Sequence, residues 1–123
     1  MEKVLSKYYD GFEGEPDIQF IYYDNKGEQK VILKIWEGYF DEIMSTIRPE
    51  LSGWTGLSYF YHLHEGWYKE SPWKIPDLKS AIQQFQSLDI EALNIKTQEV
   101  YKEIIELLLD ANLLDKDVWI AYD

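Results

Sequence analysis

Two histidines and a glutamate stand close together in the stretch His62-Leu63-His64-Glu65. The surrounding alternation of side chains predicts a β-strand, on which residues two apart share a face. Both imidazoles could then bind one metal ion. A catalytic zinc site needs three protein ligands, and because the chain has no other histidine and no cysteine, a carboxylate would have to complete it. The alternative is that both histidines are polar residues on a partly solvated sheet face.

Other catalytic chemistry has little support in the sequence. No serine lies in a G-x-S-x-G elbow, and neither a P-loop nor a G-x-G-x-x-G motif is present to hold nucleotide phosphates. With 23 Asp and Glu residues, a catalytic pair of carboxylates cannot be singled out, since such a pair is defined by unequal environments. We therefore expect a binding protein without a cofactor rather than an enzyme.

The segment from Trp54 to Trp73 is crowded with aromatic residues. Its seven aromatic side chains are Trp54, Tyr59, Phe60, Tyr61, Trp67, Tyr68 and Trp73. Tyr59 and Tyr61 alternate within the predicted strand and are expected to be buried with Leu57 and Leu63. The later rings lie among charged residues, which predicts a loop with partly exposed aromatic side chains. Since Trp and Tyr dominate binding hot spots, the candidate anchors are Trp54, Trp67, Tyr68 and Trp73. The alternative is that these rings belong to the core.

The chain is strongly acidic, with a formal net charge of -11 in 123 residues. This charge disfavours nucleic acid and favours a basic partner, although solubility alone would also favour it. One acidic stretch, Asp10 to Asp17, reads DGFEGEPD and predicts a loop. The acidic candidates for partner contact are Asp10, Glu13, Glu15, Asp17, Glu65 and Glu70.

Hydrophobic periodicity then places the elements that must position these residues. Strands are predicted at 17–24 and 29–36, as a hairpin with a turn at Asp24 to Gly27, and at 57–64 and 118–122. Helices are predicted at 38–47, from Pro76 to about Leu88, and from a Thr97 cap through about Ala111. Residues 3–9 fit either a short helix or the start of a strand.

Together these elements predict one α+β domain over residues 1–123. A small, mainly antiparallel sheet would be packed by about three helices. The absence of cysteine favours a reducing cytoplasm, and no apolar run approaches the ~18 residues that a membrane span needs. We expect neither a membrane nor a nucleic-acid partner.

In size, charge, aromatic content and α+β order, the chain resembles the immunity proteins of bacterial polymorphic-toxin and contact-dependent inhibition systems. The stretch Gly66 to Asp77, GWYKESPWKIPD, has the character of small proteins of this kind, although no diagnostic motif is present. The resemblance implies that the protein binds the toxic C-terminal domain of a cognate effector, often a basic nuclease, with carboxylates at the phosphate positions and aromatic anchors. The remaining alternatives are a small metal-binding enzyme that uses His62 and His64, and a self-associating regulatory subunit.

Overall fold

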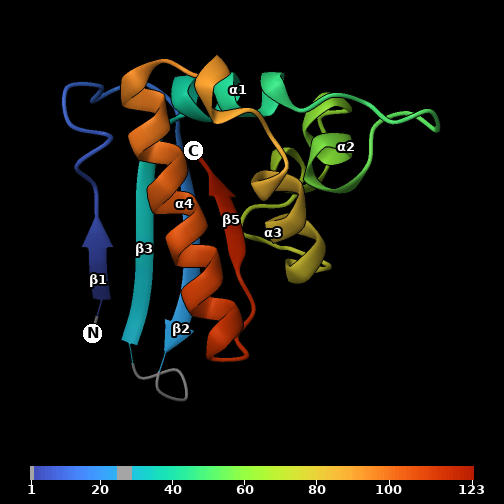
Figure 1. Ribbon diagram of the computed structural model, residues 1–123. Coiled ribbons are helices and arrows are strands. Elements are labelled where there is room, and N and C mark those ends of the chain that lie inside the picture. Colours follow the sequence, from blue (N-terminus) through green and yellow to red (C-terminus); the bar gives the residue numbers. More distant parts are fainter. Residues whose placement is uncertain (1, 25–28) are drawn as a thin grey trace.

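The computed structural model describes residues 2–24 and 29–123, in which helices pack against a five-stranded sheet (Figure 1). The strands lie in the order β1-β3-β2-β5-β4. β1 pairs with β3 in parallel and every other pairing is antiparallel, which confirms the predicted α+β class and mainly antiparallel sheet. The strands are β1 (Glu2–Leu5), β2 (Asp17–Asp24), β3 (Gln29–Trp36), β4 (Trp73–Lys74) and β5 (Trp119–Tyr122).

The predicted hairpin forms the centre of the sheet. β2 and β3 pair along their whole length, from Asp17 opposite Trp36 to Asp24 opposite Gln29. The strand alternation turns Ile18 and Phe20 into the core, where both are fully buried. The turn predicted at Asp24 to Gly27 falls largely on residues 25–27, outside the described residues. Residues 3–9, left open by the sequence, begin as the edge strand β1.

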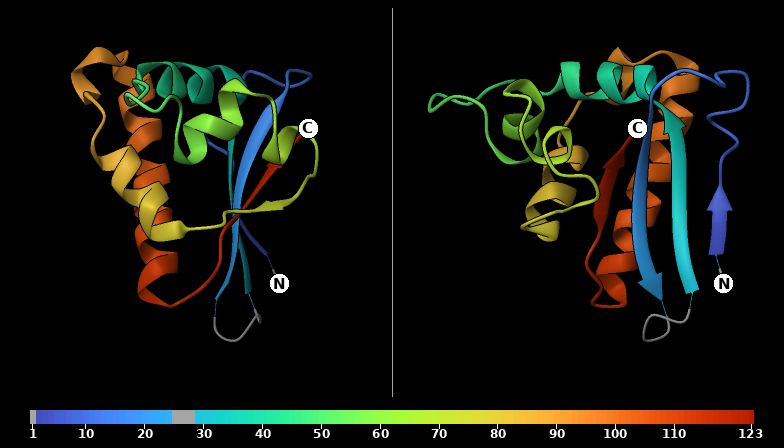
Figure 2. Two further views of the ribbon diagram at one scale, coloured as in Figure 1. Left: turned by 90° about the vertical axis from the view of Figure 1, so that its right-hand side faces the viewer. Right: turned by 180° about the vertical axis from the view of Figure 1, so that it is seen from behind.

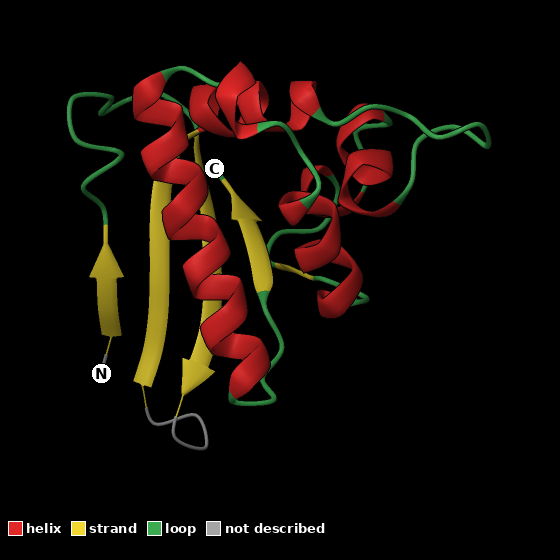
Figure 3. Ribbon diagram, in the orientation of Figure 1, coloured by secondary structure: helices red, strands yellow, loops and turns green. Residues whose placement is uncertain are grey.

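The helices gather on one face and one end of the sheet. They are α1 (Glu37–Thr46), α2 (Gly56–His62), α3 (Leu78–Gln86) and α4 (Ile95–Leu113), with short 3₁₀ turns at Gly66–Tyr68 and Ile90–Ala92. α4 runs along the face of β2 and β3, and α1 crosses one end of the sheet (Figure 3). From behind, no helix of the described residues covers β1, β2 or β3 (Figure 2). None of the described helices is long and apolar enough to span a bilayer.

The core lies between α4, α1 and the sheet. The predicted inward stripe of α4 is confirmed, since Val100, Ile104, Leu107, Leu108 and Ala111 are all buried. The predicted stripe of α1 is likewise buried, with Phe40, Ile43, Met44 and Ile47 facing inward. Both stripes recur at three- and four-residue spacing, so they place one side of each helix against the sheet.

The strand predicted at 57–64 is wrong, because residues 56–62 form α2. Alternating and helical spacing are hard to distinguish in so short an aromatic run. Tyr59 on the helix is 41% exposed and Leu63 directly after it is 50% exposed, so the burial expected for them is wrong. Tyr61 instead lies half-buried against Phe40.

Two helix starts also differ from the prediction. α3 begins at Leu78 rather than Pro76, because the side chain of Asp77 caps it by accepting a hydrogen bond from the Ser80 amide at 3.1 Å. α4 begins at Ile95, so Thr97 lies inside the first turn and is not the cap. The Thr97 hydroxyl donates to Glu42 of α1 instead, at 2.6 Å.

Candidate functional site

The acidic loop residues are mostly available at the surface. Asp10, Glu13 and Glu15 are exposed in the stretch between β1 and β2. Asp17 differs, because it begins β2 and is only 4% exposed. Its carboxylate lies 3.8 Å from the Lys34 ammonium and accepts a hydrogen bond from Gln19. The expectation that Asp17 is free for a partner is therefore wrong, since the strand pairing turns it inward.

Of the four predicted aromatic anchors, one lies in the core and three are half-buried at the surface. Trp67 is 1% exposed and packs against Phe40 and Trp73, with ring centroids 5.6 and 5.5 Å away, so its predicted exposure is wrong. The 3₁₀ turn at Gly66–Tyr68 rotates this ring into the core. Trp54, Tyr68 and Trp73 are half-buried, and each keeps some surface for a partner.

The two predicted carboxylates of the same segment have different surroundings. Glu70 is exposed, and no hydrogen bond or ion pair engages its side chain among the described residues. Glu65 is half-buried and forms an ion pair with Lys69, four residues later. Glu70 is therefore the more available of the two.

The histidines do not have the geometry that the metal hypothesis requires. His62 is the last residue of α2, and His64 lies beyond the helix in a left-handed backbone conformation with φ of 53°, so the two side chains do not share a strand face. His62 stacks on Trp54 with centroids 3.7 Å apart, while His64 is exposed and contacts Tyr68. Burial, with the nearby His64 charge, lowers the pKa of His62. The described residues contain no group of three side chains that could hold a metal ion.

A group of carboxylates and phenols does come together beside α1. We call it the acid–tyrosine cluster, and its members are Glu37, Asp41, Tyr61, Tyr68 and Tyr122. The Tyr61 hydroxyl donates a hydrogen bond to Asp41 Oδ1 at 2.9 Å. The Tyr68 ring lies between the other two phenols, with centroids 6.4 Å from Tyr61 and 5.1 Å from Tyr122. All five side chains are half-buried.

Four separate segments position this cluster. Glu37 and Asp41 are four residues apart on α1 and therefore share one helix face. Tyr61 comes from α2, Tyr68 from the following 3₁₀ turn, and Tyr122 from the end of β5. Sequence reasoning missed the cluster because its members lie up to 85 positions apart. The four-residue spacing of Glu37 and Asp41 was the only local signal.

The cluster is electrostatically unbalanced. Burial, followed by the charge of Asp41, raises the pKa of Glu37, and an interaction with the Tyr122 hydroxyl only partly opposes this. Burial and the bond to Asp41 raise the pKa of Tyr61 to about 12, and burial with the charge of Asp41 raises that of Tyr68. No lysine or arginine of the described chain forms an ion pair with Glu37 or Asp41. The cluster thus concentrates negative charge beside aromatic rings without an internal cation.

Three further rings lie near the acidic loop. Phe12 stacks in parallel on Trp36 with centroids 4.2 Å apart, and Tyr39 meets both rings edge-on. All three are half-buried. The Trp36 indole folds over Gly38 so closely that a Cβ there would meet the ring at 2.3 Å. These half-exposed rings beside exposed carboxylates were not singled out from the sequence.

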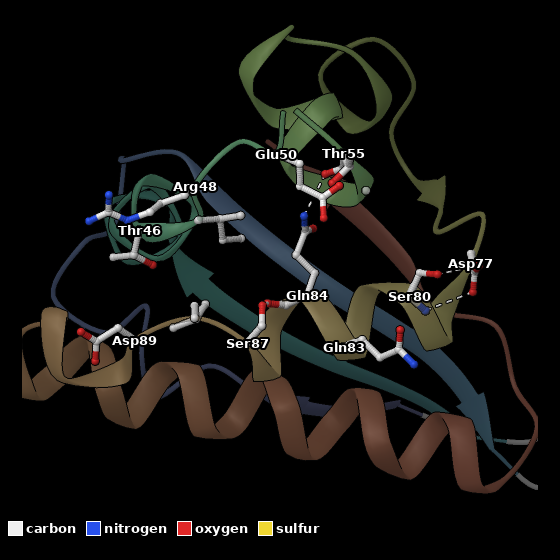
Figure 4. Close-up of a pocket in the computed structure, with 13 residues that line it drawn as sticks. Thr46, Arg48, Glu50, Thr55, Asp77, Ser80, Gln83, Gln84, Ser87 and Asp89 are labelled. Atoms are coloured by element: carbon white, nitrogen blue, oxygen red, sulfur yellow. Dashed lines mark hydrogen bonds between the residues drawn. The ribbon is translucent and has the colours of Figure 1, made fainter. Parts of the chain in front are cut away.

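A separate cavity lies between the end of α1, the 48–56 segment and α3 (Figure 4). Its volume is about 760 Å³. Gln84 crosses it to donate a hydrogen bond to the Thr55 carbonyl at 2.8 Å, and Ser80 donates to Asp77. Charges of both signs line it, including Arg48 and Glu50. Since its central polar groups bond one another, the lining selects no ligand chemistry.

Comparisons with known proteins do not assign this chain. No protein-family model matches it, and no curated protein or solved structure matches it significantly.

Proposed function

We propose that this protein is an acidic binding domain that holds and neutralises a basic protein partner. Its resemblance to immunity proteins implies that the partner is the toxic domain of a cognate bacterial effector, namely a basic nuclease. The two proteins would meet in the cytoplasm. The observation that supports the proposal best is the acid–tyrosine cluster, because it places unpaired carboxylates among half-buried aromatic rings.

The remaining surface charge supports the same function. Among the described residues, ion pairs engage four carboxylates, namely Glu2, Asp17, Glu65 and Asp117. Most of the negative charge is therefore free to act on a partner. Electrostatic steering of this kind can raise association rates to about 10⁸–10⁹ per molar per second at low salt.

Aromatic anchors would then supply the slow dissociation that inhibition requires. Trp54, Tyr68 and Trp73 stay in the proposed contact surface, as do Glu70 and the exposed acids of the 10–15 loop. Trp67 supports this surface from within the core, and Asp17 supports β2. A contact built in this way has buried anchors surrounded by a polar rim.

The test is co-expression with the C-terminal domain of a large secreted protein encoded beside this gene. We expect the toxic domain to stop growth when expressed alone and the pair to restore it. The purified proteins should bind, and association should slow as salt is raised. The proposal fails if no such neighbour exists in any host that carries the gene, or if the neighbouring domain is toxic and co-expression gives no rescue.

A further inference from the structure

We propose that the acid–tyrosine cluster is the binding site for the guanidinium group of one arginine side chain. The arginine would be presented by the basic partner, so its biological source depends on the function proposed above. The chemistry of the site can be tested without that partner.

The first argument is charge. Glu37 and Asp41 lie on one face of α1, and like charges at this spacing destabilise a helix by about 0.2–0.5 kcal/mol. Half-burial adds to this cost, since it raises the pKa of Glu37. No cation of the described chain forms an ion pair with either carboxylate. A cation from outside would remove the repulsion and gain two charge-assisted hydrogen bonds.

The second argument is shape. Tyr61, Tyr68 and Tyr122 form a connected row of rings beside the two carboxylates. A guanidinium is planar and weakly hydrated, so it can stack on a phenol while its edge donates to carboxylates. The ammonium group of lysine is a compact and strongly hydrated charge, so it gains less from contact with the tyrosine rings. The combination of paired acids and rings therefore favours arginine over lysine.

The third argument is an incomplete polar network beneath the cluster. Trp67 is 1% exposed, and its indole Nε1 has no hydrogen-bond partner within residues 2–24 and 29–123. The Trp67 ring lies next to the Tyr68 ring, with centroids 5.6 Å apart, so the unpaired indole is adjacent to the cluster. Buried donors are rarely left unpaired, so a network lacking one bond fits a site that is completed on ligand binding.

The test uses a small probe that carries the side chain alone, Nα-acetyl-arginine N-methylamide. We expect it to shift the ring resonances of Tyr61, Tyr68 and Tyr122 in a saturable NMR titration. The citrulline analogue has nearly the same shape without the charge, and we expect it to bind at least about tenfold more weakly. The lysine analogue should fall between the two.

Matched variants separate the site from general acidity. Glu37→Gln together with Asp41→Asn removes both charges but leaves an oxygen for the Tyr61 hydroxyl, and should weaken arginine binding at least about tenfold. Glu106→Gln together with Asp110→Asn removes a Glu–Asp pair of the same spacing from the exposed face of α4, and should leave binding unchanged. Tyr68→Phe, which retains the ring, should weaken binding less than the double charge variant.

The inference is overturned if arginine and citrulline probes give equal shifts, or if the Glu37/Asp41 variant, with its amide spectrum otherwise retained, still binds like the wild type. Binding of the probe without rescue in co-expression would reject the inhibitor function and keep the arginine site. Rescue without probe binding would keep the function and reject the site.

Discussion

Glu42 is expected to be the main link between α1 and the start of α4. Its carboxylate accepts three hydrogen bonds, from the Asn94 amide at 2.7 Å, the Asn94 side chain at 3.1 Å and the Thr97 hydroxyl at 2.6 Å. The Glu42 carboxylate thus caps the start of α4, since the side chain of Asn94, the N-cap residue, makes no capping hydrogen bond. Glu42→Ala leaves the buried Thr97 hydroxyl without this acceptor.

The magnitude follows from these bonds. A hydrogen bond to a charged group contributes about 1.5–3 kcal/mol, and because Asn94 is exposed, water replaces part of what is lost. We expect Glu42→Ala to lower the free energy of unfolding by about 2–3 kcal/mol near neutral pH. Glu42→Gln, which keeps one acceptor oxygen, should lower it by about 1 kcal/mol.

The same contact has a defined pH dependence. Burial tends to raise the pKa of Glu42, but the bonds from Thr97 and Asn94 outweigh it and lower the pKa below the ordinary value of 4.5. The unfolded chain therefore binds the proton first as pH falls. The stabilising contribution is complete above that value and is lost as pH falls through the folded pKa. The difference in stability between wild type and Glu42→Gln should shrink between neutral pH and about pH 3.

The assay is urea unfolding of wild type, both Glu42 variants and Glu106→Ala. Glu106 is exposed on α4, and its removal should change stability by no more than about 0.5 kcal/mol. The reasoning is refuted if Glu42→Ala matches Glu106→Ala, or if the difference between wild type and Glu42→Gln is as large at about pH 3 as at neutral pH.

Three further predictions concern the rings and the histidine. Trp67→Ala should lower the free energy of unfolding by about 3–5 kcal/mol in thermal or urea unfolding. Trp54→Ala should remove only the stack on His62 and lower it by about 0.5–1.5 kcal/mol. Equal effects of the two substitutions would contradict the burial of Trp67. Gly38→Ala should shift the ring resonances of Trp36 and Phe12, because the added Cβ would meet the Trp36 indole. Replacing glycine by alanine inside a helix ordinarily stabilises a protein by about 0.5–1 kcal/mol, and here the gain should be smaller. Unchanged resonances would contradict the packing of Trp36 over Gly38. An NMR titration should give His62 a pKa below its ordinary value of 6.5. The free energy of unfolding should therefore fall as pH drops through 6.5 towards the pKa of the folded protein, and His62→Gln should lose this dependence. A pKa at or above 6.5 would contradict the burial of His62.

Local patterns predicted the parts of the fold that are long and periodic. The hairpin of 17–24 and 29–36 followed from strict alternation, and the buried stripe of α4 followed from helical spacing. The α2 segment was misassigned because seven residues with four aromatic or histidine side chains fit either period. The start of α4 was misplaced because Glu42, distant in the sequence, supplies the acceptor that a local cap would have supplied.

The candidate site was less predictable than the fold. The exposed acids of the 10–15 loop followed from composition, and so did the half-buried Trp54 and Trp73. The burial of Trp67 depends on how a short 3₁₀ turn docks against α1, which no local pattern encodes. The acid–tyrosine cluster requires the register of β5 and the packing of α2, so it became visible only in three dimensions.

Calorimetric titration of the protein with the toxic domain encoded beside its gene tests the central claim most directly. Wild type and the Glu106/Asp110 variant should bind with equal affinity, and the Glu37/Asp41 variant should bind at least about tenfold more weakly, which corresponds to about 1.4 kcal/mol. An unchanged affinity in the Glu37/Asp41 variant, or no binding by the wild type, would contradict the claim that unpaired carboxylates among tyrosine rings hold a basic partner.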